Sequence, residues 1–120
     1  MIALSLIVLC CTDLERSRAF YTALGLHFGE ERHDNGPVHY SCQLGTVVIE
    51  LYPGKPGSAL ARTSAGATLH GFRVDSLDAI VSSLQVQGTE IVHLPSDSPW
   101  GRRAVILDPD GRAIELTQIP

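Results

Sequence analysis

The pattern of hydrophobic and polar positions divides the chain into two halves that follow the same order. The first half opens with an apolar run, MIALSLIVLCC, which is followed directly by the polar segment TDLERS. No basic segment precedes the run, so we interpret it as a buried first strand rather than as a targeting segment. A helix is then expected from Leu14 to Leu24, with Asp13 as its N-cap and Gly25 in the left-handed conformation at its C-terminal end.

The second half repeats this order. Ser76 is the expected N-cap of a second helix, and Gly88 is expected to end it. The differences 77 − 14, for the first helical leucines, and 88 − 25, for the terminal glycines, are both 63. A repeat of this length indicates two copies of one supersecondary unit. One buried face of the second helix is predicted from the i, i+3, i+4 and i+7 spacing of Leu77, Ile80, Val81 and Leu84.

Three strand-like segments follow each predicted helix. They cover residues 26–31, 38–45 and 46–52 in the first half, and residues 89–94, 102–108 and 112–118 in the second half. The order βαβββ in each half makes the expected fold class α+β. Two segments rich in Gly, Pro and Ser, residues 53–68 and 95–101, are expected to be a connector and a loop.

Composition narrows the class of protein further. The chain has 120 residues, a length that favours one compact domain. Its net charge of −4 lacks the basic footprint of nucleic-acid binders, and its 44% hydrophobic and 18% charged residues indicate neither disorder nor a membrane span. Three cysteines without framework spacing indicate reduced thiols, and we therefore expect a cytoplasmic protein.

The motifs of the two halves resemble a known superfamily. The segments DLERSRAFY, VVIEL, FRVDSLDAIVSSLQVQG and DPDGRAIEL are similar to those of the vicinal oxygen chelate superfamily, which includes glyoxalases, bleomycin-resistance proteins and extradiol dioxygenases. The resemblance covers nearly the whole chain. It implies a single domain of two modules, about residues 1–53 and 67–120, whose sheets form a cup around a ligand with the helices on the outer face. Many members complete the cup as a homodimer, which we also expect here.

The resemblance also bears on metal binding. Metal-dependent members hold a divalent cation with four side chains, usually His or Glu, from the first and last strand of each module. Glu50 and Glu115 match the last-strand positions, but Leu6 and Leu69 stand at the first-strand positions. Because a transition-metal site usually has three or four N, O or S donors, we expect no tightly held metal ion.

The alternative is a divalent metal ion bound by Glu50, Glu115 and His70, which requires a slip of one residue or a bulge that turns His70 to the face of the glutamates. Alternation along the strand favours the opposite side for His70, facing the helix with Phe72 and Val74. The other histidines show no pair at a spacing typical of metal ligands: His27, His33, His39 and His93.

Alternation along the strands also selects the candidate binding residues. It places Val48, Glu50 and Tyr52 on one face and Ala113, Glu115 and Thr117 on another, and by resemblance these faces line the cup. Arg73 is expected in the same lining, where it can pair with a carboxylate, and Trp100 belongs to a loop that can close over the cup. The predicted ligand-binding residues are Glu50, Tyr52, Arg73, Trp100 and Glu115.

The leading functional hypothesis is a glyoxalase/bleomycin-resistance-like protein that binds a small organic molecule without a tightly held metal. The alternatives are a metal-dependent lyase, isomerase or dioxygenase that uses Glu50 and Glu115 as ligands, and an interaction module in which a glutamate and Arg73 form an internal ion pair. No catalytic residue follows from the sequence. Whether the protein is an enzyme therefore stays open.

Overall fold

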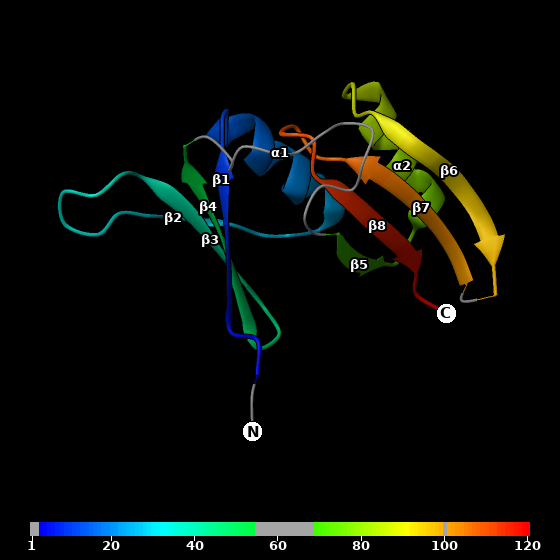
Figure 1. Cartoon of the computed structure of the whole chain (residues 1–120), viewed down its shortest axis with the longest axis horizontal. Helices are drawn as coiled ribbons and strands as arrows, with labels where there is room; N and C mark the ends of the chain where they lie inside the picture. The colour runs from blue at the N-terminus through cyan, green and yellow to red at the C-terminus, as the bar shows by residue number, and fades with distance from the viewer. Residues whose placement is uncertain (1–2, 55–68, 100) are drawn as a thin grey trace. The chain divides into compact units, whose positions relative to one another are not determined.

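The computed structural model describes residues 3–54, 69–99 and 101–120. The chain divides into two compact units, Met1–Pro56 and Gly57–Pro120, and the described residues of each unit form one four-stranded sheet and one helix (Figure 1). Each unit has the order βαβββ, so the predicted α+β class is confirmed. The predicted connector lies outside the described residues from position 55 to position 68.

The first unit has one helix on a mixed sheet. The spatial order of its strands is β1-β4-β3-β2, in which β1 runs parallel to β4 and the other pairs are antiparallel. Its elements are β1 (Leu6–Cys11), α1 (Leu14–Leu24), β2 (Gly29–Glu31), β3 (His39–Leu44) and β4 (Val47–Pro53).

Helix α1 begins and ends where the sequence predicts. The carboxylate of Asp13 accepts a hydrogen bond from the backbone N–H of Arg16, 3.1 Å away, and so satisfies one of the N–H groups that the first turn leaves without a partner. Gly25 has a φ of 115° and donates its N–H to the carbonyl of Thr22. A left-handed residue without a Cβ ends the helix at low cost.

Alternation along the strands divides the first sheet into two faces. The face toward α1 is apolar and buried, with Leu9, Cys11, Cys42, Ile49 and Leu51 at its centre. Tyr40 lies on the same face, and its hydroxyl donates a hydrogen bond to Glu15 of α1. We call the opposite face of each sheet, directed away from the helix of its own unit, the far face.

The second unit repeats the arrangement of the first. Its strand order is β5-β8-β7-β6, with β5 parallel to β8 and the remaining pairs antiparallel. Leu77, Val81 and Leu84 of the predicted helix face are buried, whereas Ile80 is only partly buried. Its elements are β5 (His70–Val74), α2 (Leu77–Val86), β6 (Ile91–Ser98), β7 (Gly101–Leu107) and β8 (Ala113–Gln118).

The N-terminus of α2 differs from the sequence prediction. Ser76 precedes the helix, but its side chain makes no capping hydrogen bond. Instead the side-chain carbonyl of Gln118 on β8 accepts from the backbone N–H of Leu77 at 2.8 Å, and its amide group donates to the carbonyl of Asp75. A residue 41 positions away in the sequence therefore caps α2 and joins it to the end of the sheet.

Residues 95–101, expected to be a loop, are mostly strand. β6 continues through Pro95 to Ser98, and β7 begins at Gly101. Proline is tolerated here because β6 is an edge strand and its register with β7 shifts between His93 and Ser96, where a backbone N–H is not required. Within the described ranges, neither helix is long and apolar enough to cross a membrane.

We expect the replacement of Gln118 by Leu to lower the free energy of unfolding by about 1 kcal/mol, because the N–H of Leu77 then loses its acceptor. The matched control is Ser76→Ala, which removes a side chain that makes no capping bond. Urea denaturation of both variants measures the difference. A cost for Ser76→Ala equal to that for Gln118→Leu would contradict this assignment.

The hydrogen bond between Tyr40 and Glu15 is expected to make a pH-dependent contribution to stability. The Tyr40 hydroxyl, with a smaller contribution from Arg18, lowers the pKa of Glu15 below 4.5. A lowered pKa in the folded state stabilises the protein above the pKa of the unfolded state, and this contribution is lost as the pH falls through the folded-state pKa. Tyr40→Phe should therefore raise the Glu15 pKa toward 4.5.

The measurement is an NMR titration of the Glu15 carboxyl carbon, with urea denaturation at neutral and at acidic pH. The stability difference between wild type and Tyr40→Phe should be larger at neutral pH than below the Glu15 pKa. An unchanged Glu15 pKa in the variant would show that the hydroxyl does not stabilise the carboxylate.

Candidate functional site

A row of polar side chains crosses the far face of the first sheet. Glu31 on β2 is paired with His39 on β3. Because Tyr40 is paired with Leu51 in the antiparallel pair of β3 and β4, the preceding residue His39 lies opposite Tyr52. Directly opposed residues of neighbouring strands point to the same face. The rings of His39 and Tyr52 accordingly stack, with centroids 4.1 Å apart and planes at 11°.

His39 is the buried centre of this row, with 1% of its surface exposed. Its Nδ1 lies 3.2 Å from the carbonyl oxygen of Pro37, which can only accept, so Nδ1 carries the hydrogen. Its Nε2 faces the Tyr52 hydroxyl at 3.2 Å and the carboxylates of Glu31 at 3.4 Å and Glu50 at 3.7 Å. One ring nitrogen is therefore held by the backbone, and the other is directed at oxygen atoms.

Glu50 is half-buried, with 16% of its side chain exposed, beside this imidazole. In the neighbouring strands it is paired with Val8 of β1 and Ser41 of β3. Burial, followed by the negative charges of Glu50 and Glu31, raises the pKa of the Tyr52 hydroxyl above 10.0. The hydroxyl therefore stays protonated at neutral pH and can donate a hydrogen bond.

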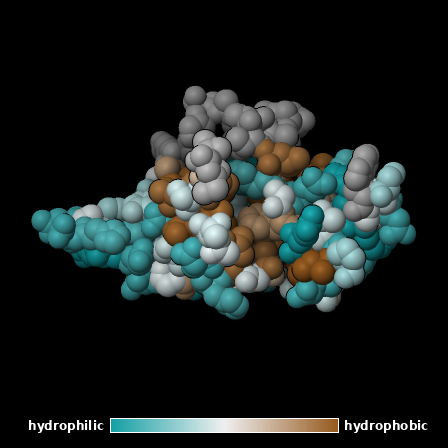
Figure 2. Space-filling view, turned by 90° about the horizontal axis from the view of Figure 1, so that it is seen from below, coloured by the Kyte–Doolittle hydropathy of each residue, from teal (hydrophilic) through white to brown (hydrophobic). Residues whose placement is uncertain are grey.

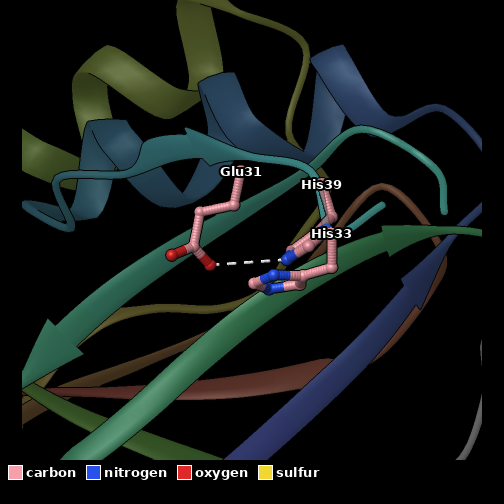
Figure 3. A group of neighbouring side chains, drawn as sticks. All are labelled: Glu31, His33 and His39. Carbon is pink, nitrogen blue, oxygen red and sulfur yellow. Dashed lines mark ion pairs between the residues drawn. The ribbon is translucent and has the colours of Figure 1, made fainter. Parts of the chain in front are cut away.

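The β2–β3 hairpin adds a third donor side chain to Glu31 and His39. The ligand atoms of Glu31, His33 and His39 lie within 4.8 Å of one another, and Figure 3 shows the three side chains converging. The connecting residues 32–38 are mostly exposed and form a hydrophilic protrusion (Figure 2). This group was missed in the sequence, because His33 and His39 are six positions apart and meet only when the hairpin pairs Glu31 with His39.

The far face of the second sheet carries Glu115 and two arginines. Glu115 is paired with Gly71 and Val105, whereas Arg73 and Arg103 are both paired with Thr117. The Nε of Arg103 donates to Glu115 at 2.8 Å, and both side chains are partly exposed. Among the described residues, no ion pair joins Arg73 to Glu115, and the carboxylate pairs instead with the arginine on the other neighbouring strand.

Apolar side chains continue the second far face beyond this ion pair. Val105, Leu107 and Ala113 form a buried cluster next to Glu115. Arg102 directly precedes Arg103 on β7 and therefore points to the opposite face, where it forms an ion pair with Asp78 of α2 at 2.8 Å. The far face therefore changes from apolar to charged along β7 and β8.

Two of the four positions that the resemblance assigns to the family metal cage carry no metal-ligating atom. Leu6 lies on the far face with Glu50, and Leu69 precedes β5, but neither side chain has a donor atom. His70 is paired with Ile114, whereas Glu115 is paired with Gly71, so His70 and Glu115 point to opposite faces. Burial and the nearby Arg112 lower the pKa of His70, which is consistent with its position on the helix side. Trp100, the remaining predicted binding residue, lies outside the described residues.

Comparisons with known proteins agree on one family. The model of the glyoxalase/bleomycin resistance protein/dioxygenase superfamily matches residues 3–116. A protein of Bacillus subtilis, the uncharacterized protein YwkD, is 34% identical over 117 residues, which cover 92% of this chain and 91% of that protein.

Solved structures show the same fold. The hypothetical protein SA1046 of S. aureus matches with a TM-score of 0.74 at 20% identity, covering 99% of this chain and 98% of that one. TnmS3, an antibiotic binding protein from Streptomyces sp. CB03234, matches with a TM-score of 0.71 at 23% identity, covering 100% and 98%. A glyoxalase/bleomycin resistance protein from the same Streptomyces strain has a TM-score of 0.67 at 25% identity, covering 97% and 100%. This chain therefore belongs to the glyoxalase/bleomycin resistance protein/dioxygenase superfamily.

Proposed function

We propose that the protein binds a small organic molecule with an aromatic or apolar body, through the far face of its first sheet. The observation that carries the proposal is the position of Glu50, a half-buried carboxylate beside apolar side chains that are themselves uncovered. Leu6 is 50% exposed and Val8 is 45% exposed, although both lie in a β-strand of a folded unit. Small-molecule sites commonly combine an apolar surface with a few polar groups that fix orientation.

The polar groups of this face indicate which functional groups the ligand carries. The carboxylate of Glu50 only accepts hydrogen bonds when ionised, so it favours an amino or hydroxyl group, or a positive charge, on the ligand. The Tyr52 ring stacks on His39 on one side and offers hydrogen bonding at its hydroxyl. An aromatic amine is therefore the ligand class that this face fits best.

The far face of the second sheet carries a separate set of polar groups that can bind a ligand. Arg103 is occupied by Glu115, but Arg73 is exposed beside Thr117, on the same far face as the apolar cluster of Val105, Leu107 and Ala113. An exposed guanidinium can bind a carboxylate or a phosphate with two parallel hydrogen bonds. We include Arg73 and Glu115 in the proposed function as ligand-positioning groups, as the sequence predicts.

Relatives support binding as the role of the fold without defining the ligand. TnmS3 is an antibiotic binding protein, and its likeness to this chain concerns the fold. The family also contains metal-dependent members, in which chemistry runs through the four-position cage. Because Leu6 and Leu69 provide no donors here, the proposed binding does not use a metal ion held in that cage.

The test is a ligand-observed NMR screen of aromatic amines and aromatic carboxylates, followed by titration calorimetry of the amines that bind. Replacement of Glu50 by Gln should weaken the binding of an aromatic amine by about ten-fold, because a hydrogen bond to a charged group is worth about 1.5–3 kcal/mol. Tyr52→Leu should weaken the same amine through the loss of ring contact.

The matched control is Glu30→Gln. Glu30 is also a glutamate of the first sheet, but it is exposed and paired with Tyr40, so it points to the helix side. Affinity that falls equally in Glu30→Gln and Glu50→Gln would show a general effect of charge. Equal affinity of the Glu50→Gln variant and wild type for every amine that binds would contradict the proposed site.

A further inference from the structure

We infer that Glu31, His33 and His39 form a binding site for a divalent transition-metal ion that is separate from the four-position cage of the family. All three side chains come from the β2–β3 hairpin of one unit, and their ligand atoms converge within 4.8 Å (Figure 3). This inference goes beyond the proposed function. Its three ligands do not include Glu50, and it is tested without an organic ligand.

The spacing of the donor atoms fits a small cation. In a tetrahedral zinc site with bonds of about 2.0–2.1 Å, neighbouring ligand atoms are about 3.3 Å apart. The Oε1 of Glu31 and the Nε2 of His39 are 3.4 Å apart. The rings of His33 and His39 have centroids 5.1 Å apart and are inclined at 38°, so that rotation of the exposed His33 can bring its nitrogen to the same point.

His39 has the orientation that a metal ligand needs. Its Nδ1–H donates to the Pro37 carbonyl, and this bond fixes both the ring and the tautomer, leaving Nε2 as the coordinating atom. Burial of the ring prevents it from turning away. A metal-binding histidine typically donates its other ring N–H to a backbone carbonyl or a carboxylate in the same way.

The remaining two ligands give the ion access and charge compensation. His33 is exposed, and 42% of the Glu31 side chain is exposed, so that an ion can enter from solvent. Glu31 supplies one negative charge, and the Glu50 carboxylate lies 3.7 Å from Nε2 of His39 as a further source of negative charge. The Tyr52 hydroxyl, which now faces Nε2, is the group that the ion has to displace.

The donor set selects the class of ion. Two imidazoles and one carboxylate suit Zn²⁺ and Fe²⁺, whereas Mg²⁺ and Ca²⁺ prefer oxygen ligands. Three protein ligands leave at least one coordination position for water or another molecule, as in catalytic rather than structural zinc sites. The site is therefore able to bind an ion and still accept an external ligand.

The experiment measures metal binding directly on the untagged protein, since a histidine tag would itself bind the ion. After dialysis against a chelator, the protein is titrated with Zn²⁺ in competition with a chromophoric indicator, and with Co²⁺ to record its visible absorption. We expect one Zn²⁺ per chain. We expect His33→Ala and Glu31→Gln each to weaken Zn²⁺ binding by at least about ten-fold, since each removes one of three ligands.

Two control variants match these changes. His93→Ala removes another exposed histidine, on β6, and Glu30→Gln removes the charge next to Glu31 on the opposite face. Both should bind Zn²⁺ as wild type does. His33 is exposed, so its replacement should leave urea denaturation of the metal-free protein unchanged within about 0.5 kcal/mol.

Two outcomes would overturn the inference. One is a wild-type protein that fails to compete with the indicator for Zn²⁺. The other is stoichiometric binding that survives in both His33→Ala and Glu31→Gln, which would place the ion elsewhere. Neither outcome bears on amine binding at Glu50, which is measured separately.

Discussion

The register between β2, β3 and β4 determines which side chains of the first unit are available for chemistry. The pairs Glu31 with His39 and Tyr40 with Leu51 set this register. Because the side-chain period of a strand is two, a slip of one residue would turn His39 toward α1 and Tyr40 away from it. The apolar packing of Leu51 and its neighbours under the helix therefore fixes the polar row on the far face.

Burial of His39 links stability with the proposed chemistry. A buried polar group is costly unless it is hydrogen-bonded, and both ring nitrogens here have partners, the Pro37 carbonyl and the Tyr52 hydroxyl. The contacts that make the buried ring tolerable also prevent it from rotating. A rigid donor is thus a consequence of folding, whereas the exposed His33 and Glu31 keep the freedom that binding requires.

Sequence reasoning succeeded where local rules decide the outcome. The bounds of α1, its Asp13 cap and the shared face of Val48, Glu50 and Tyr52 all follow from spacing within one segment. It placed Ser76 correctly at the N-cap position of α2 but could not find the capping bond, because the capping carbonyl comes from Gln118 on a strand at the end of the chain. It named only Arg73 as a possible partner of a carboxylate, whereas Glu115 pairs with Arg103. Both arginines are paired with Thr117, and only side-chain geometry separates them.

Glu50 and Glu115, the two glutamates that the resemblance assigns to the family metal cage, have different partners in the two units. A half-buried carboxylate needs a partner in place of the cation. Each unit supplies one from a neighbouring strand: Glu115 binds the guanidinium of Arg103, and Glu50 lies beside His39 and Tyr52. The partners differ in kind, because a guanidinium holds a permanent charge, whereas an imidazole and a phenol exchange hydrogen bonds. The far faces of the two sheets therefore carry different chemistry, although the sheets have the same topology. The far face of the first sheet carries a group of donors around His39, and that of the second sheet carries an ion pair with an arginine.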